Sequence, residues 1–306
     1  MDKGFFLILS LGCQFVFLAA DLIERRLTRD RRHGAEPLKP TSLMFLIGVI
    51  FVYGVIQFGG LALIPKTEIL LEAIRRHLTL PVLFPSASQT LTVFQWTLLG
   101  IAGFYIAGFW DYIVHRFMSH SQPLWFTHEY HHLPNELCLG LPGLCVRPFV
   151  VVAVLPSTIG TLVTMCAGLA LLGLNRLPLM PLVYAVIFAQ MLILLATHSS
   201  FFLQFPRIHH ILKYTAITTP QEHELHHTVD LKGNYGNFTV LWDRVFGTYL
   251  DPLKAENQGH QLGLSYDQDF LGAITMGKWK LPADLRERFQ VGRYCNINHK
   301  PTGKAS

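Results

Sequence analysis

Residues 128–132 read His-Glu-Tyr-His-His and residues 223–227 read His-Glu-Leu-His-His, two copies of one His-x-x-His-His pattern placed 95 residues apart. On a helix, the spacing i, i+3, i+4 puts all three imidazoles on one face. Neutral imidazole is the commonest protein ligand for a transition metal. Each copy therefore predicts half of a polynuclear metal site, and His115 and His120, just upstream of the first copy, add two candidate ligands.

The composition around these motifs is strongly apolar. The 306-residue chain is 51% hydrophobic and 15% charged, with a mean hydropathy of +0.34, whereas soluble globular chains carry about 25% charged residues. This predicts an integral-membrane protein. The net charge of +5 is modest and dispersed, which fits contact with anionic lipid headgroups and argues against a nucleic-acid partner. The five cysteines form no CxxC pair, so we expect no structural disulfide and a reducing compartment for the polar part.

Five apolar segments approach the roughly 20 residues that a helix needs to cross a bilayer. They run over residues 5–20, 43–64, 91–110, 149–174 and 177–196. The short turn at Asn175 predicts that the last two segments form a tight helical hairpin. The first segment is short and ends in Ala19-Ala20, as a cleaved signal peptide would, but the Arg-rich stretch that follows it favours a retained anchor.

The basic loop after the first segment sets the predicted orientation. It holds Arg25, Arg26, Arg29, Arg31, Arg32 and Lys39, and the positive-inside rule places it in the cytoplasm. Counting spans from there brings the third and fifth segments back to the cytoplasmic side just before the histidine clusters. The sequence therefore predicts an all-α, multi-pass membrane bundle of four to five transmembrane helices, with a cytoplasmic helical cap that carries a polyhistidine metal site.

Nine histidines are the predicted catalytic metal ligands, because they cluster at helical spacing or close an apolar segment. They are His115, His120, His128, His131, His132, His198, His223, His226 and His227. His198 is included because it ends the fifth apolar segment, where an unpaired polar group is costly. The remaining histidines are expected to be hydrogen-bonding or surface residues, namely His33, His77, His209, His210, His260 and His299.

The sequence around both copies resembles a known superfamily. Residues 125–132, Trp-Phe-Thr-His-Glu-Tyr-His-His, together with His115-Arg116, look like the fatty acid hydroxylase/sterol desaturase superfamily. Residues 219–227, Thr-Pro-Gln-Glu-His-Glu-Leu-His-His, resemble it more closely, as do Asn-Tyr-Gly-Asn at 234–237 and Leu-Trp-Asp-Arg-Val-Phe-Gly-Thr-Tyr at 241–249. The resemblance covers roughly residues 95–250.

The resemblance implies an integral-membrane enzyme with a non-haem di-iron centre. Such enzymes use O₂ and electrons to hydroxylate or desaturate a lipid, here a sterol-like or fatty acyl molecule. By the family pattern, the histidine motifs and a further histidine near the end of the last span hold two iron ions. The implied location is the endoplasmic reticulum of a eukaryote or the inner membrane of a bacterium.

The first histidine pair departs from the sterol desaturase pattern. Those members usually space the pair at i and i+4, where this chain has Ser119, and His120 stands instead at i+5 from His115. That position lies about 140° round an ideal helix. The spacing resembles the fatty acid 2-hydroxylase and acyl desaturase branches, and a π-bulge or a helix end near Ser119 would let both rings converge.

The expected function is a di-iron lipid monooxygenase, with desaturation on the same site as an alternative. An all-imidazole shell supplies neutral ligands and leaves positive charge on the metals, which favours a high redox potential. The alternative of another class is a non-catalytic membrane protein with a structural or decayed metal site. A zinc-dependent membrane hydrolase is a third reading, and it would need fewer ligands than are present.

Acidic residues near the motifs are candidates to hold the imidazoles in the right tautomer. They are Asp111, Glu129, Glu222, Glu224 and Asp243. Asp111 is four residues before His115 and therefore shares its helix face, whereas Asp243 and Arg244 can also pair with each other.

The chain contains no His-Pro-Gly-Gly motif of cytochrome b5, so we expect a separate electron donor resembling cytochrome b5, a ferredoxin or a reductase. A basic patch that can dock this donor holds Lys278, Lys280, Arg286 and Arg288. The predicted organisation is N-terminal transmembrane helices at 1–110, a catalytic domain with a transmembrane hairpin at 111–250, and a cytoplasmic tail at 251–306.

Overall fold

The computed structural model describes residues 3–27, 66–84 except 79, 90–139 except 136 and 138, 151–174, 177–265, and 269–288 except 270, 273, 274 and 276. Within these ranges the chain is mostly helical and forms no strand, only isolated bridges such as Ile217 with Thr239. Residues 66–77 form a helix. The other long helices are α1 (Lys3–Leu27), α3 (Val93–Val114), α4 (Val151–Leu171) and α5 (Met180–Thr197).

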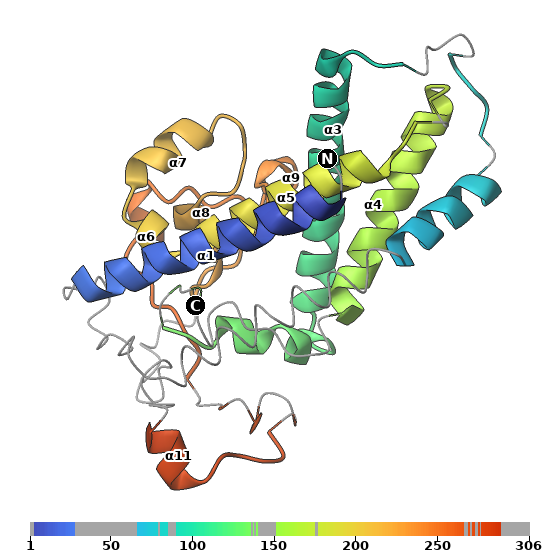
Figure 1. Ribbon diagram of the computed structural model, residues 1–306. Helices are drawn as coiled ribbons and strands as arrows, with labels where there is room; N and C mark the ends of the chain where they lie inside the picture. Colours follow the sequence, from blue (N-terminus) through green and yellow to red (C-terminus); the bar gives the residue numbers. More distant parts are fainter. Residues whose placement is uncertain are drawn as a thin grey trace.

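The remaining elements are short and all follow α3 in the chain (Figure 1). They are the π-turn η1 (His115–Ser119), the 3₁₀ turns η2 (Trp125–Thr127), η3 (Glu129–His132) and η5 (Ala255–Asn257), and the helices α6 (Ser200–Leu203), α7 (Pro206–Leu212), α8 (Pro220–His226), α9 (Leu241–Val245) and α11 (Ala283–Arg288). Helix α8 begins with Pro220 at its first position, where the missing N–H would have no helical partner anyway.

Three of the described helices are long and apolar enough to cross a membrane, namely Gly4–Asp21, Val93–Ser119 and Met180–Thr197. They coincide with the first, third and fifth predicted segments. The fourth segment forms α4, whose apolar part, Leu155–Leu171, is shorter. The second predicted segment, at 43–64, lies outside the described residues.

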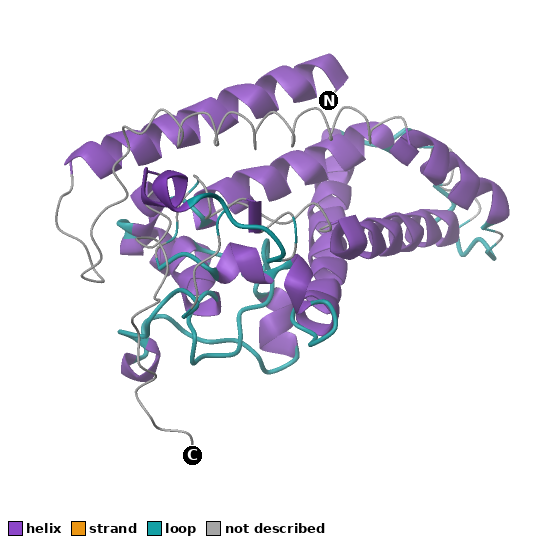
Figure 2. Ribbon diagram, turned by 90° about the horizontal axis from the view of Figure 1, so that it is seen from below, coloured by secondary structure: helices purple, strands orange, loops and turns teal. Residues whose placement is uncertain are grey.

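Helices α4 and α5 both pack against α3, and α5 also lies beside α1 (Figures 1 and 2). The predicted tight hairpin of α4 and α5 is wrong, because α4 runs beside α3 whereas α5 crosses α3 and runs beside α1 (Figure 1). Leu162 and Met165 of α4 and Leu182 of α5 belong to one buried core cluster. The apolar faces that predicted a hairpin are thus buried on a third helix instead.

Close packing fixes α4 against the C-terminal half of α3. A Cβ at Gly160 of α4 would lie 2.3–2.6 Å from atoms of the Trp110 ring of α3, so only glycine fits there. The Trp110 indole N–H donates to the Thr164 hydroxyl at 2.9 Å. This contact lies one turn before His115 and so positions the end of α3, from which the first candidate ligands project.

A buried carboxylate ties α1 to the corner after α5. Asp21, only 2% exposed, accepts the Ser199 hydroxyl and the backbone N–H groups of Leu139 and Phe201. Near the start of α1, Phe6 stacks on Tyr184 of α5 with ring centroids 5.2 Å apart. Because Ser199 follows His198, the first helix helps to fix the end of α5.

Candidate metal centre

Nine imidazoles converge at the ends of α3 and α5 and on α8. They form a five-histidine group of His115, His120, His128, His132 and His226, and a four-histidine group of His131, His198, His223 and His227. Within each group, the candidate ligand nitrogens all lie within 4.8 Å of one another. Eight of the nine side chains are buried, and His120 is partly exposed. The structure therefore brings together every residue that the sequence predicts as a ligand.

The two His-x-x-His-His copies are interleaved between the groups rather than forming one group each. His128 and His132, four residues apart, join the five-histidine group, whereas His131 between them joins the other. The second copy mirrors this, since only His226 joins the five-histidine group. Each copy therefore contributes an i, i+4 pair to one group and its remaining histidine to the neighbouring group.

A π-turn brings His115 and His120 together. Residues His115–Ser119 form η1, and the His120 backbone N–H donates to the His115 carbonyl at 3.1 Å, five residues back. The extra residue in this turn offsets the i+5 spacing, and the two Nε2 atoms lie 3.3 Å apart. The π-bulge predicted near Ser119 is present.

The first copy does not lie on an α-helix, contrary to the expectation from its spacing. His128 ends the 3₁₀ turn η2, and the rest of the copy forms η3. The rings still converge, because the Nε2 of His128 lies 2.9 Å from that of His115 and 3.0 Å from that of His132. The i, i+3 spacing alone cannot distinguish the two helix types, since both bring residues three apart to one side.

The second copy lies on α8, which carries a capping box at its start. The Thr219 hydroxyl accepts the Glu222 backbone N–H at 3.3 Å, and the Glu222 carboxylate accepts the Thr219 backbone N–H at 2.9 Å. His227 is the C-cap residue of the same helix. This short helix is therefore fixed at its N-terminus directly before its first candidate ligand, His223.

His198 joins α5 to the four-histidine group. Its Nε2 lies 3.0 Å from the Nε2 of His223 and 3.1 Å from that of His131. Its Nδ1 bonds the Leu194 carbonyl at 2.8 Å, so Nδ1 carries the proton and Nε2 carries the lone pair. Lone-pair nitrogens that face one another in a buried space fit a shared cation, which supports the use of this donor set for a metal.

Burial keeps these imidazoles neutral. Desolvation, followed by the nearby histidines, holds the pKa values of His128, His132, His223 and His227 well below the ordinary range. Burial lowers the pKa values of His226 and His198 to about 4. In each case a hydrogen bond to a backbone carbonyl raises the pKa and offsets part of this effect. Neutral imidazoles are the form that binds metal, so the donor set is ready at neutral pH.

Asp111 and Asp243 do not bond the imidazoles in the manner predicted, because both accept hydrogen bonds from residues 235–237 instead. Asp111 accepts the backbone and side-chain N–H groups of Asn237 at 2.9 and 3.0 Å, and the His115 Nδ1 bonds the Tyr235 carbonyl instead. Asp243 accepts backbone N–H groups of the same loop, and Arg244, its predicted partner, lies 3.7 Å from Glu222. Burial raises the pKa of Asp243 to about 6, although its hydrogen bonds lower it.

The backbone carbonyls that hold the imidazoles are what sequence reasoning missed. Besides Leu194, they belong to Gly233 and Tyr235, within a loop where Asn234 has a φ of 51°. The turn residues there predict a loop, but every residue has a backbone carbonyl. The side-chain pattern therefore cannot show which carbonyl accepts a hydrogen bond from an imidazole.

The other histidines that the structure describes lie outside both groups. His209 is buried and bonds the Thr219 hydroxyl at 3.0 Å, His210 is exposed, and His260 bonds the Glu256 carbonyl at 2.9 Å. His77 is an exposed residue at the end of the helix at 66–77. His33 and His299 lie outside the described residues.

One member of the predicted donor patch has a structural partner. Arg286 bonds the buried Asp269 at 2.7 Å and so fixes α11. Lys278 is exposed, and the side chain of Arg288 lies outside the described residues. Arg286 is therefore less available to a partner than the sequence suggested.

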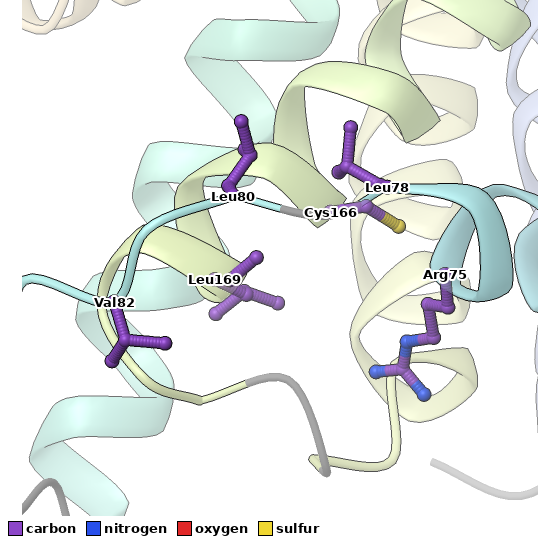
Figure 3. Close-up of a pocket in the computed structure, with 7 residues that line it drawn as sticks. Arg75, Leu78, Leu80, Val82, Cys166 and Leu169 are labelled. Atoms are coloured by element: carbon purple, nitrogen blue, oxygen red, sulfur yellow. The ribbon is translucent and has the colours of Figure 1, made fainter. Parts of the chain in front are cut away.

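A cavity of about 340 Å³ lies away from the histidines (Figure 3). It is lined by Arg75, Leu78, Leu80, Val82, Cys166, Leu169 and Ala170. The cavity residues from α4 are Cys166, Leu169 and Ala170, which come shortly after Met165. The Met165 side chain packs near Gly103, in the first half of α3. The cavity therefore lies towards the start of α3, whereas the histidines follow its end, and it is not the metal centre.

Comparison with known proteins agrees with the motifs. The family model described as fatty acid hydroxylase matches residues 100–248, a range that contains both histidine groups complete. No match was found among curated proteins or among solved structures. Residues 100–248 therefore match the fatty acid hydroxylase family, and all nine histidines lie within that match.

Proposed function

We propose that this protein is a non-haem di-iron oxygenase that hydroxylates a membrane lipid, with O₂ as co-substrate and electrons from a separate donor. The observation that carries the proposal is the pair of adjacent, all-imidazole groups at the ends of two apolar helices, within a match to the fatty acid hydroxylase family. Desaturation on the same site is the alternative, because both reactions begin with hydrogen abstraction from carbon.

The histidines prepare the site for this chemistry. Bound iron would supply the electrons that activate O₂ and the oxidising power that breaks a C–H bond. The protein keeps the imidazoles neutral and buries eight of the nine rings away from water. Hydrogen bonds from Nδ1 of His115, His198 and His226 to backbone carbonyls leave Nε2 of these rings free to bind metal. No acidic side chain belongs to either group, so the donor set is uniform.

Substrate is expected to approach from the side of His120, the one partly exposed ring. Trp125 and Tyr235 flank this ring, with centroids 5.2 and 5.3 Å from it. Phe117, 58% exposed, lies in the same π-turn at the end of α3. An apolar entrance at the end of an apolar helix suits a sterol-like or fatty acyl molecule that enters from the bilayer.

The proposed topology puts the site on the cytoplasmic side, because the basic loop after α1 favours that side. The electron donor would then dock on the same face. The organelle would be the endoplasmic reticulum in a eukaryote, and the membrane would be the inner membrane in a bacterium.

Isotope-labelled lipid analysis tests the proposal. Cells with and without the gene are grown under ¹⁸O₂, and metal is measured in the purified protein. Hydroxylation predicts iron in the protein and ¹⁸O in a lipid that only the expressing cells contain. Loss of two hydrogens without label would show desaturation, and protein without iron that changes no lipid would favour the non-catalytic reading.

A zinc hydrolase is supported less well by the geometry. Both copies also read His-Glu-x-x-His, the pattern of zinc metalloproteases, in which two histidines bind one zinc. Here each i, i+4 pair meets two or three further imidazoles from other segments. A catalytic zinc site usually has three protein ligands, so nine imidazoles favour a centre of two metals.

A further inference from the structure

The loop at 233–237, between α8 and α9, gives two backbone carbonyls to the five-histidine group. The Gly233 carbonyl accepts from Nδ1 of His226 at 3.0 Å, and the Tyr235 carbonyl accepts from Nδ1 of His115. Each bond keeps the proton on Nδ1 and leaves the Nε2 lone pair for a metal. The tautomer and orientation of these two imidazoles therefore depend on the path of this loop.

In the four-histidine group, the carbonyl that orients His198 lies in a helix and not in a loop. The carbonyl that accepts from Nδ1 of His198 belongs to Leu194, one turn earlier in α5 itself. That carbonyl is fixed by the helix and needs no loop. A change in the loop at 233–237 should therefore affect the five-histidine group more than its neighbour.

Asp243 of α9 fixes the middle of the loop. Its Oδ1 accepts the Tyr235 backbone N–H at 2.8 Å, and its Oδ2 accepts the Gly236 backbone N–H at 2.8 Å. The Thr248 hydroxyl also donates to Oδ1, at 2.7 Å. The carboxylate is fully buried, and its two oxygens accept from two successive backbone N–H groups of the loop.

Asp111 fixes the far end of the same loop to α3. It accepts the Asn237 backbone N–H and side-chain NH₂ at 2.9 and 3.0 Å. The backbone between the two carboxylates runs close to its neighbours, since a Cβ at Gly236 would lie 2.0 Å from the Thr239 carbonyl oxygen. Because Asp111 precedes His115 by one turn, the loop is attached to the helix that carries the imidazole it orients.

We propose that Asp243 is a positioning residue for the five-histidine group, acting through the loop whose carbonyls orient His115 and His226. This inference rests on the proposed metal centre. Aspartate suits the position because both oxygens accept, whereas asparagine has one acceptor and would direct its NH₂ at a backbone N–H. Removing one acceptor from a buried pair of donors leaves a donor unsatisfied and shifts the loop.

Cobalt titration of the purified, metal-free full chain tests the proposal. His226→Ala and His223→Ala first assign the visible absorption of bound Co²⁺ to the five-histidine and four-histidine groups. Asp243→Asn should weaken the component that His226→Ala removes by roughly 10- to 100-fold, as for other outer-shell partners of metal ligands. The component that His223→Ala removes should stay.

Asp269→Asn is the matched control. Asp269 is also a buried carboxylate, 1% exposed, that accepts two backbone N–H groups, at Gly272 and Leu281, but it lies outside the loop. This variant should keep both cobalt components even if its unfolding temperature falls. Unchanged cobalt binding in Asp243→Asn, or a parallel fall of both components with the unfolding temperature, would overturn the positioning role.

A second variant covers the case in which Asp243→Asn does not fold. Asp111→Asn alters the other attachment of the loop and should weaken the same component selectively. Equal loss from both groups in this variant would contradict the inference. Wild-type protein that binds no cobalt would instead overturn the proposed metal centre, and the inference with it.

Discussion

At the scale of single residues, tautomer control decides which nitrogen each histidine presents. His115, His198 and His226 each bond a backbone carbonyl through Nδ1. A backbone carbonyl does not titrate, so these bonds fix the tautomer over the whole range in which the protein is folded. Asp111 and Asp243 instead accept backbone N–H groups of the loop beside the site.

His131→Ala should lower product formation by more than about 100-fold, because losing a direct ligand should exceed the 10- to 100-fold effect of losing an outer partner. His131 lies between His198 and His227, with an Nε2–Nε2 distance of 3.1 Å to the former and ring centroids 4.5 Å apart from the latter. Turnover in purified membranes measures the effect. His210→Ala, at an exposed histidine, should retain activity, and full activity in His131→Ala would remove that residue from the centre.

The metal-free protein should lose stability as the pH falls below about 6.5. The pKa values of His198 and His226 are about 4 in the folded state, below the value of about 6.5 expected after unfolding. The unfolded state therefore binds protons first, and each such histidine lowers the free energy of unfolding by up to about 1.4 kcal/mol per pH unit between 6.5 and 4. Unfolding temperatures measured from pH 7.5 to 5 check this, and a constant value would contradict it.

At the scale of elements, short helices are held by caps and close contacts because they are too short to be stable alone. Helices α3 and α8 both begin with a capping box, Thr92 with Gln95 and Thr219 with Glu222. The first starts a helix of 22 residues, and the second starts one of seven. The same local motif should therefore matter differently for the metal centre.

Thr219→Ala should lower the free energy of unfolding by about 1 kcal/mol and also weaken metal binding, because α8 carries three candidate ligands. Thermal unfolding and metal titration measure the two effects. Thr92→Ala removes the equivalent cap far from the histidines and should leave metal affinity unchanged. Equal metal affinity in both variants would show that the cap of α8 has no bearing on the site.

Gly160→Ala should destabilise the packing of α4 on α3 by about 1–3 kcal/mol, because its Cβ would meet the Trp110 ring within 2.6 Å. Gly168→Ala is the control on the same helix, since a Cβ there meets nothing within 4 Å. Thermal unfolding in detergent compares the two. A similar unfolding temperature for both variants would contradict the close approach of α3 and α4.

At the scale of the whole molecule, the sequence predicted the helical class and the convergence of the nine histidines, and three of its five predicted apolar segments coincide with helices long enough to cross a membrane. Hydropathy and histidine spacing report on these features directly. The sequence did not predict the packing of α4 and α5 on α3, since an apolar face does not specify its partner. Nor did it predict the interleaved copies. The i+3 histidine of each copy, His131 or His226, joins the other group because of how the two copies pack against each other. That packing is tertiary structure, which local spacing does not encode.

The interleaving of the two copies has a consequence for biosynthesis. The five-histidine group requires His226 and the four-histidine group requires His227, while both also draw on residues before α4. In a nascent chain, the five-histidine group is complete only after residue 226 and the four-histidine group only after residue 227, when both α4 and α5 have been made. Metal loading is therefore expected to follow the synthesis of both helices, and once loaded, each ion would act as a cross-link between early and late parts of the polypeptide.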